Sequence, residues 1–302
     1  MVPEVLHIVV VYNGKAWLPQ LVESVEASGT GEVWAIDHGS TDGSWEWLRE
    51  HLPASNRIQG PNLGFGSGNN RGMEEALRRG VPAVHLLNQD ARVDPQGMRV
   101  MTDWILQRER EGHALEVVSP IHWDWEGKVP YEHFDKRYAP QWREHTVPFE
   151  VPFIHAASWL MTLNTVRQVG GFNPAFFMYG EDNEWAHRLK KAGGRFWIHP
   201  EGSLFHDEKP KPWPKPTVLE RMAFAAEVTA FFEGTSTAAE WRRSAFRRAV
   251  ARALHPHRWL DVLTGSMWLG ERSAMRRVRE NAEAWEAART AMRHQESPHL
   301  IP

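Results

Sequence analysis

The sequence predicts an α/β protein in which a mostly parallel sheet is flanked by helices and followed by a helical C-terminal appendage. Over residues 6–87, short runs rich in β-branched residues alternate with stretches of helical periodicity. A proline-rich segment at 209–216 separates this part from a stretch with helical periodicity alone. The 302-residue chain is 42% hydrophobic, which is enough for a large core and a smaller second one.

Strands and helices alternate in the N-terminal part. Strands are predicted at residues 6–11, 33–36, 83–87, 153–163 and 195–198. Amphipathic spacing and terminal glycines predict helices at residues 17–27, 44–52, 69–79 and 181–192. Brief connections favour a parallel sheet that is covered on both faces, and ligands of such sheets bind at the carboxyl ends of the strands.

Two later parts of the chain depart from this alternation. Residues 122–152 combine aromatic residues, prolines and charges without periodicity, which predicts an irregular excursion over the sheet. Helices are predicted at residues 218–232, 238–253, 258–269 and 271–294. The expected organisation is a domain at 1–208, a proline-rich linker at 209–216 and a helical region at 217–302.

Composition excludes several classes of protein. The absence of cysteine rules out disulfides, thiol nucleophiles and cysteine-ligated metals, so any metal must be held by carboxylate, amide or imidazole groups. A net charge of 35 − 38 = −3 gives no reason to expect a nucleic-acid partner. No apolar run approaches the length of a membrane span, and residues 1–11 lack the features of a secretory signal, which together predict a cytoplasmic location.

Charge and tryptophan are unevenly distributed. Residues 241–302 contain twelve arginines and six acids, a charge of +6, which leaves −9 for the rest of the chain. The 16 tryptophans have two candidate roles, packing in cores or stacking on flat ligands such as sugar rings. Trp17, Trp45 and the C-terminal tryptophans fit helix faces, whereas Trp159 and those at 123–142 lie where a sugar or acceptor can stack.

A polar loop at residues 37–44 directly follows the second predicted strand. Asp37 can accept the imide N–H of a uracil or thymine ring, and the turn that follows, beginning with Gly39, can donate backbone N–H groups. The alternative is an ordinary capping loop, because Ser and Asp at such positions cap the next helix.

A glycine-rich segment at residues 62–72 precedes a predicted helix. Its glycines at alternate positions allow the backbone to approach a ligand closely, and the N-terminus of the helix favours an anion. Arg71 is expected in the first turn of that helix. The segment is not the dinucleotide-binding fingerprint, which belongs after the first strand.

Asn88 and Asp90 stand two residues apart at the end of a predicted strand, so their side chains are expected to point the same way. Together they can share Mg²⁺ or Mn²⁺ with a diphosphate. The alternative is a turn that merely ends the strand. His206, which follows the last predicted strand, can complete such a metal site or can be one surface histidine among 16.

Glu181 and Asp182 begin a predicted helix behind the aromatic loop at residues 172–179. Acids at a helix start suit the helix dipole, which is the structural explanation. The functional explanation is a general base, because a carboxylate beside a partly desolvated aromatic pocket has a pKa raised toward neutrality.

Taken together and in this order, these segments resemble the nucleotide-sugar-dependent glycosyltransferases of family 2, which have the GT-A (Rossmann-like) fold. The likeness covers roughly residues 5–208 and is carried by segments 9–13, 36–44, 62–72, 86–91 and 170–188. Within the family, the Asn-Leu-Gly-Phe sequence at 62–65 and the Leu-Leu-Asn-x-Asp sequence at 86–90 are most similar to the rhamnosyltransferase-like branch.

The resemblance implies a role for each matching residue. Asp182 is implied to be the catalytic base, with Glu181 beside it orienting the acceptor, and Asp90 and His206 are implied to bind Mg²⁺ or Mn²⁺. Asn88 departs from the Asp that many members carry, and His38 stands where Asn or Asp is commoner. The residues expected along the nucleotide are Val11, Tyr12, Asn13, Asp37, Gly39, Asn62, Gly64, Asn70, Arg71, Asn88 and Gln89. Those expected around the sugar or acceptor are His155, Ala157, Trp159 and Tyr179.

The implied reaction is transfer, with inversion, of a hexose or of a deoxyhexose such as rhamnose. The donor is expected to be a UDP- or dTDP-sugar, and the acceptor a glycan, a lipid-linked sugar or another hydroxyl compound in bacterial glycan or glycoconjugate synthesis. Aromatic loops at 176–179 and 123–142 are expected to act as lids that exclude water. Two alternatives are a sugar nucleotidyltransferase, which needs a basic glycine-rich loop where Tyr12 to Gly14 stand, and a catalytically silent carbohydrate-binding relative.

The C-terminal helices have a separate set of interpretations. Trp241, Arg242, Arg243, Phe246, Arg247 and Val250 mix basic and apolar side chains in the manner of a membrane-surface helix. Such a helix suits a lipid-linked acceptor and a peripheral place at the inner face of a membrane. Packing against the catalytic domain and a homodimer interface are equally open interpretations.

Overall fold

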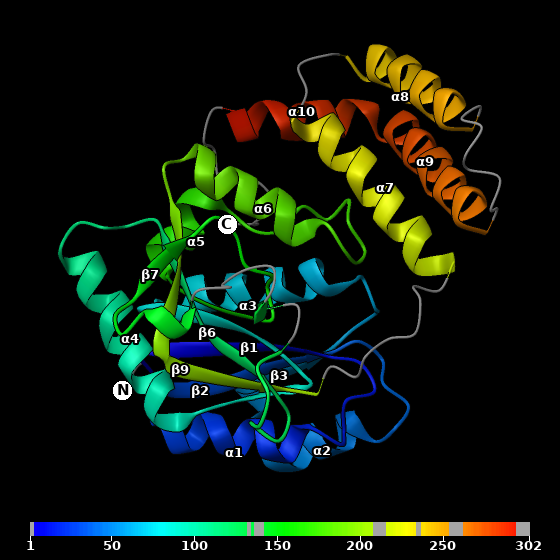
Figure 1. Cartoon of the computed structure of the whole chain (residues 1–302). Coiled ribbons are helices and arrows are strands. Elements are labelled where there is room, and N and C mark those ends of the chain that lie inside the picture. Colours follow the sequence, from blue (N-terminus) through cyan, green and yellow to red (C-terminus); the bar gives the residue numbers. More distant parts are fainter. Residues whose placement is uncertain are drawn as a thin grey trace.

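The computed structural model describes residues 3–131, 134–135, 142–207, 216–233, 237–253 and 262–293. Within these ranges a sheet with helices on both faces forms the body of the molecule, and a helical region lies beside it (Figure 1). The predicted linker at 209–216 lies outside the described residues, except for Pro216, which begins a helix.

The first half of the sheet is parallel, as the alternation of strands and helices predicts. The strand order is β3-β2-β1-β4, with every pairing parallel. The strands are β1 (Val5–Val11), β2 (Gly31–Asp37), β3 (Arg57–Gln59) and β4 (Ala83–Asn88). The helices between them are α1 (Leu18–Ser28), α2 (Ser44–His51) and α3 (Phe65–Arg79), with the short η1 (Ala54–Asn56) before β3.

The second half of the sheet is mixed rather than parallel. The order continues β4-β8-β6-β9-β5, with β7 also paired to β9, and among the described strands four of eight pairings are parallel. The sheet departs from the expected mostly parallel arrangement because β8 enters beside β4 in the opposite direction. The strands are β5 (Ala91–Val93), β6 (Glu116–Asp124), β7 (Phe149–Val151), β8 (Ser158–Thr162) and β9 (Arg195–His206). The helices are α4 (Pro95–Arg110), α5 (Leu163–Val169), α6 (Glu181–Lys191) and the short η3 (Trp142–Glu144).

Two hydrophobic clusters pack the helices onto the sheet. One cluster joins the strands to α1, α2 and α4 through side chains such as Leu21, Leu48 and Met101. The other joins them to α3, α5 and α6 through side chains such as Met73 and Trp185. Helices therefore cover both faces, and the loops at the strand ends remain available for a site.

The helix α3 begins at Phe65, four residues before the predicted start, so the glycine-rich segment forms its first turns. The physical reason is close packing on the sheet. A Cβ on Gly66 would lie 2.8 Å from the Cβ of Phe172, and one on Gly68 would lie 2.7 Å from Val10 Cγ2. At these two positions the glycines serve the contact between the helix and its neighbours.

The aromatic side chains at the end of β6 and after it pack against the hydrophobic core where the structure describes them. Phe134 is fully buried and stacks on His122, with ring centroids 4.7 Å apart. Trp123 meets Trp142 edge to face at 5.5 Å. These described residues stabilise the surface of the sheet by apolar contact, and residues 132–133 and 136–141 of the predicted excursion lie outside the described part.

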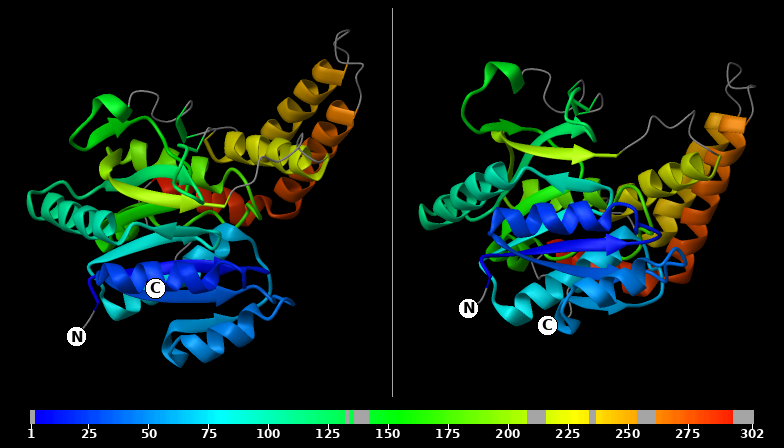
Figure 2. Two further views of the ribbon diagram at one scale, coloured as in Figure 1. Left: turned by 60° about the horizontal axis from the view of Figure 1, so that its bottom comes forward. Right: turned by 90° about the horizontal axis from the view of Figure 1, so that it is seen from below.

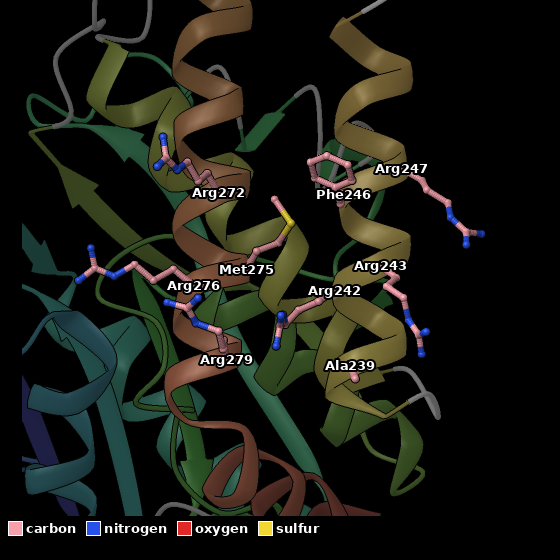
Figure 3. A pocket seen from close by; sticks show the side chains of 9 residues that line it. All are labelled: Ala239, Arg242, Arg243, Phe246, Arg247, Arg272, Met275, Arg276 and Arg279. Atoms are coloured by element: carbon pink, nitrogen blue, oxygen red, sulfur yellow. The ribbon is translucent and has the colours of Figure 1, made fainter.

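The helical region consists of α7 (Pro216–Glu233), α8 (Ala238–Ala253), α9 (Val262–Glu280) and α10 (Ala282–Arg293). The predicted break near residue 270 is wrong, because α9 continues through Gly270. The missing side chain lets α9 approach the α7 backbone at Glu220. The pair α8 and α9 extends away from the sheet (Figure 2), and arginines line the groove between them (Figure 3). In the described part of the chain, no helix is both long and apolar enough to cross a bilayer.

Candidate active site

The carboxyl ends of β1, β2 and β4 lie level in the sheet. Val11 is the register partner of Asp37, and Val10 is the partner of Asn88. Three of the loops singled out from the sequence therefore meet at one edge. Ligands of such sheets bind at this edge, outside the strand ends.

Asn13 and Gln89 hold these loops together. The Asn13 backbone N donates to Ser40 Oγ at 2.9 Å, and Asn13 Oδ1 accepts from the Thr41 backbone N at 2.9 Å. Gln89 clamps Tyr12, since its Oε1 accepts from the Tyr12 N at 2.8 Å and its Nε2 donates to the Tyr12 O at 3.1 Å. The sequence placed both residues along the nucleotide, and the structure shows that their side chains shape the loops there.

Asp37 is fully buried at the end of β2. Its Oδ2 accepts from the backbone N of Gly39 and of Ser40, both at 3.1 Å, and from Gln59 Nε2 at 3.0 Å. Its Oδ1 has no hydrogen-bond partner among the described residues. A buried carboxylate oxygen without a partner is costly, so this atom is a strong acceptor for a ligand N–H.

The start of α3 is joined to the aromatic loop before α6. Asn62 Oδ1 accepts from the Gly64 N at 3.1 Å, and the Phe65 N donates to the Phe177 O at 3.2 Å. Gly64 has φ = +93°, and any side chain there would collide with the Phe177 carbonyl. Asn62 and Gly64 therefore bring the loop of residues 176–179 against the helix N-terminus.

Asn70 and Arg71 differ from their expected positions. Asn70 is buried, with Nδ2 donating to the Phe172 O at 2.8 Å and Oδ1 accepting from the Phe172 N at 2.7 Å. Its side chain thus binds the backbone of the loop that leads into α6. Arg71 lies beyond the first turn because α3 starts early, and it pairs with Glu74 at 3.4 Å on the exposed face. The position of Arg71 follows from the earlier helix start, whereas that of Asn70 follows from the packing of α3 against Phe172.

Asp90 and His206 are brought together by the pairing of β5 with β9, although they are 116 residues apart. Asp90 Oδ1 and His206 Nε2 are 3.1 Å apart, and Asn88 Nδ2 is 3.4 Å from the same nitrogen. The Asp90 O also accepts from the Asp207 N at 2.9 Å. The ring of Tyr131, which the sequence did not assign to the site, lies 6.1 Å from the His206 ring.

This group supplies one carboxylate, one imidazole and one amide. In the described part of the chain, no three His, Asp or Glu side chains converge as a metal cluster. The donor set fits a hard divalent cation that takes its remaining ligands from phosphate oxygens and water. The residues at the predicted metal position are therefore suited to a metal bound together with a diphosphate.

Glu181 and Asp182 begin α6, and burial changes the protonation of both. Burial and, secondly, the charge of Asp182 raise the pKa of Glu181 to about 8. Burial also raises the pKa of Asp182, and the N–H groups that donate to its carboxylate from Asn183 and Ala156 oppose this rise. At neutral pH Glu181 is mainly protonated, so Asp182 is the member of the pair that is suited to carry negative charge.

Two further residues of α6 anchor this acidic pair. Arg188 pairs with Glu184 at 2.9 Å and donates to the carbonyls of Val169 and Gly171. Sequence reasoning missed both residues, although acid and arginine four apart on a helix is a recognisable signal. Their contacts tie the helix to the turn that leads into the aromatic loop.

The segment before β8 lies between the two acidic groups. The Ala157 O accepts from the Asn88 N at 3.0 Å, and the Ala156 N–H donates to Asp182. The Ala157 N donates to the O of the half-buried His155 at 2.9 Å. The structure therefore places the backbone of residues 155–157 between Asn88 and Asp182, and the Ala157 side chain is buried in the core.

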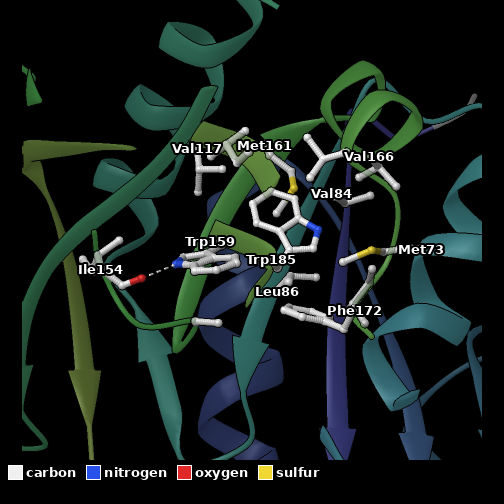
Figure 4. Packing of buried hydrophobic residues seen from close by; sticks show 14 of the residues in the cluster. Met73, Val84, Leu86, Val117, Ile154, Trp159, Met161, Val166, Phe172 and Trp185 are labelled. Carbon is white, nitrogen blue, oxygen red and sulfur yellow. Dashed lines mark hydrogen bonds between the residues drawn. The ribbon is translucent and has the colours of Figure 1, made fainter. Parts of the chain in front are cut away.

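Trp159 does not line an accessible pocket. Its side chain is fully buried, its Nε1 donates to the Ile154 O at 3.1 Å, and its ring packs 5.1 Å from that of Trp185 (Figure 4). The prediction that a sugar stacks on Trp159 is wrong, because β8 turns this residue into the core between the sheet and α6.

The aromatic loop before α6 divides into an anchored part and an exposed part. Phe176 is buried in the core of the helical region, and Gly180 lies close to Ala225 of α7. Phe177 and Tyr179 are exposed, and Tyr179 has φ = +71°. The helical region thus supports the loop that carries Tyr179, and the part of the loop that is available to a ligand is residues 177–179.

The raised pKa of Glu181 predicts a stability change with pH. The folded protein holds the proton up to a pKa of about 8, whereas the ordinary value is 4.5, so unfolding releases a proton in this window and stability falls as pH rises. We expect E181Q to melt slightly above the wild type at pH 5 and several degrees above it at pH 8. The control is E50Q, which changes an exposed side chain of α2. Thermal melts from pH 5 to 8 measure this; a constant difference would contradict the assignment.

Comparison with known proteins gives the family. The sequence model of Glycosyl transferase family 2 matches residues 7–164, more than half of the chain. N-acetylglucosaminyl-diphospho-decaprenol L-rhamnosyltransferase of Mycobacterium tuberculosis (strain CDC 1551 / Oshkosh) is 26% identical over 282 residues, covering 82% of this chain and 85% of the relative. Low-salt glycan biosynthesis hexosyltransferase Agl10 of Haloferax volcanii is 23% identical over 203 residues, covering 63% of each.

Solved structures give the fold. GalNAc-T7 with UDP, GalNAc and Mn²⁺ has a TM-score of 0.56 at 14% identity, over 94% of this chain and 58% of its own length. S. aureus TarS 1-349 with UDP-GlcNAc has a TM-score of 0.55 at 13% identity, over 97% and 88% respectively. These neighbours share the GT-A fold with this chain. The chain belongs to glycosyl transferase family 2, and it is a glycosyltransferase with the GT-A fold.

Proposed function

We propose that the protein transfers a hexose or deoxyhexose, with L-rhamnose as the first candidate, from a UDP- or dTDP-sugar to a hydroxyl of a lipid-linked acceptor, with inversion at the anomeric carbon. The observation that carries the proposal is the bridge at residues 156–157. Ala157 binds Asn88 beside the Asp90–His206 pair, and its neighbour Ala156 binds Asp182. A sugar at this bridge has diphosphate ligands on one side and a base on the other.

The donor nucleotide is assigned to the loops after β1 and β2. Asp37 Oδ1 accepts the imide N–H that uracil and thymine share, since it is the oxygen left without a protein partner. Gly39 and Ser40 hold the other oxygen, which fixes the carboxylate orientation. Both UDP and dTDP donors satisfy this contact.

Asp90, His206 and Asn88 would hold Mg²⁺ or Mn²⁺ at the diphosphate. GalNAc-T7, a structural neighbour, was solved with UDP and Mn²⁺, which supports a divalent cation. When bound, the cation neutralises charge on the departing diphosphate. The described residues contribute one carboxylate there, so we assign the remaining ligands to the diphosphate and water.

Asp182 is assigned as the general base. It takes the proton from the acceptor hydroxyl as the oxygen forms a bond to the anomeric carbon and the bond to the diphosphate breaks. One displacement inverts the anomeric centre. Protonated Glu181 adds no second negative charge at neutral pH, and we assign it to hold the acceptor. His155 and Tyr179 are placed around the sugar or acceptor.

The identity of the relatives supports the substrate assignment. The relative from M. tuberculosis is named as an L-rhamnosyltransferase that acts on N-acetylglucosaminyl-diphospho-decaprenol, and the relative from H. volcanii as a hexosyltransferase. A lipid-linked acceptor places the reaction at a membrane surface. We therefore propose a cytoplasmic enzyme that contacts the inner membrane face, and an interface between two copies of the chain is the alternative use of its C-terminal helices.

A panel of nucleotide sugars tests the donor assignment. We expect dTDP- and UDP-sugars, with Mn²⁺ present, to raise the melting temperature, because a ligand at 100 times its Kd adds about 2.7 kcal/mol to stability. The variant D37A should lose most of this increase, whereas D103A, which changes an exposed side chain of α4, should keep it. A larger increase with GDP-sugars, or an unchanged response of D37A, would contradict the assignment.

Product analysis separates the candidate reactions. A glycosyltransferase releases nucleoside diphosphate when donor and acceptor are both present. A nucleotidyltransferase releases pyrophosphate from a nucleoside triphosphate, and a silent relative releases neither. Detection of the nucleoside diphosphate and the glycosylated acceptor by mass spectrometry therefore decides between them.

A further inference from the structure

A basic groove of about 670 Å³ lies between α8 and α9, in the helical region. Six arginines line it, three from each helix, and among the described residues no acidic side chain does. They are Arg242, Arg243 and Arg247 of α8 and Arg272, Arg276 and Arg279 of α9. Arg243 and Arg247 point outward from α8, away from α9 (Figure 3). The sequence pointed to the arginines of α8 alone, and folding adds those of α9.

Most of these arginines have no ion-pair partner among the described residues. Arg276 pairs with Glu280 at 2.9 Å. Arg242, Arg247, Arg272 and Arg279 have no ion pair with any carboxylate among the described residues, and the latter three are exposed. Unpaired guanidinium groups at this density repel one another, and an anionic partner with several phosphates relieves that repulsion.

Exposed apolar side chains accompany the arginines. Phe246 lines the groove and is 61% exposed, and Trp268 is 44% exposed with Arg272 over its ring at 5.2 Å. Val250 and Leu269 are also exposed on the same two helices. Trp241, by contrast, is buried in the core of the helical region and takes no part in this surface.

We propose that the α8–α9 groove is a docking surface for a membrane that contains anionic phospholipids. The arginines bind the phosphate headgroups, and Phe246 and Trp268 enter the boundary between headgroups and acyl chains. Charge complementarity selects this occupant, because a second copy of the chain would present the same positive groove. The pair of helices extends away from the sheet (Figure 2), which leaves this groove at the outer end of the molecule.

This inference rests on the proposed function for its role, since a lipid-linked acceptor requires an enzyme that works at a membrane. Its test requires neither donor nor acceptor. Failure of the vesicle experiment therefore leaves the transfer assay unaffected, and failure of the transfer assay leaves vesicle binding unaffected.

The test is flotation of the full chain with vesicles of phosphatidylcholine alone or with about 30% phosphatidylglycerol, at an ionic strength where surface potential still acts. We expect binding to the anionic vesicles and little to the neutral ones. The variant R242Q/R272Q/R279Q should bind on the order of 100-fold more weakly, since each arginine near an anionic surface contributes roughly a factor of five to ten. The variant F246S keeps all six arginines of the groove but removes an apolar side chain, and it should also bind the vesicles more weakly.

The matched control is R49Q/R99Q/R110Q, which removes three exposed arginines from α2 and α4 and should bind as the wild type does. Melting temperatures of all variants confirm that each is folded. Equal loss in both triple variants, or undiminished binding of the groove variant, overturns the proposal. Release of the wild type by millimolar inorganic phosphate would show that the groove serves free phosphate instead, and equal binding to neutral vesicles also overturns the proposal.

Discussion

Replacing Asp182 with asparagine is expected to lower kcat about 10³-fold, because positioned general bases contribute typically 10²–10⁴ in rate. The amide keeps the size of the side chain but cannot accept the acceptor's proton at neutral pH. Donor binding should change little, since Asp182 contacts Asn183 and Ala156 rather than the β1 and β2 loops. The measurements are the initial rate of nucleoside diphosphate release and the thermal shift by the donor.

Two controls make the Asp182 prediction specific. D103N makes the same chemical change at an exposed side chain of α4 and should leave the rate unchanged. The wild-type rate should rise as pH increases through the pKa of Asp182, which burial raises above its ordinary value, and D182N should lack this rise. Turnover of D182N close to that of the wild type would remove the base assignment.

Removing the carboxylate of Asp90 is expected to have the second largest effect. D90N removes the carboxylate from the proposed ligands and leaves an imidazole and an amide. Because a Lewis acid is worth several kcal/mol at a departing diphosphate, we expect the rate at low Mn²⁺ to fall on the order of 10³-fold. Part of the loss should return at high Mn²⁺. The measurement is the rate as a function of Mn²⁺ concentration after treatment with EDTA.

Adding a carboxylate at Asn88 tests the metal position independently of Asp90. N88D adds a carboxylate in the position that lies 3.4 Å from His206 Nε2, so this variant should reach half-maximal rate at a lower Mn²⁺ concentration than the wild type. An enzyme that keeps its full rate after exhaustive EDTA treatment, and that responds to neither substitution, would not use a metal at this position.

Local patterns were sufficient for the parallel first half of the sheet and its helices, but not for β5, β6 and β7 of the second half. The run at β1 is β-branched and buried, and Gly29 ends α1 with φ = +63°, so strand and helix follow from neighbours in the chain. The helix α4 lies outside the predicted helices, although Asp94 caps it by accepting from the Gly97 N and Pro95 occupies its first position. That signal was present and is local.

Side-chain roles required the tertiary structure. Asn70 and Trp159 have the residue types of a ligand site, yet one binds the Phe172 backbone and the other fills the core. Whether a polar or aromatic side chain meets a ligand or another part of the chain depends on which distant segment packs against it. Spacing along the chain contains no information on that partner.

The sequence by itself determined the alternation of strands and helices from β1 to β4, the loops that carry Asp37 and Asp90, and the acidic start of α6, because these depend on local periodicity and turn residues. Only the tertiary structure decided that Asp90 meets His206 and that α8 and α9 combine their arginines in one groove. It also decided that burial raises the pKa of Glu181 to about 8. The physical reason is that contacts between distant residues and the exclusion of water arise from packing, which no local pattern specifies.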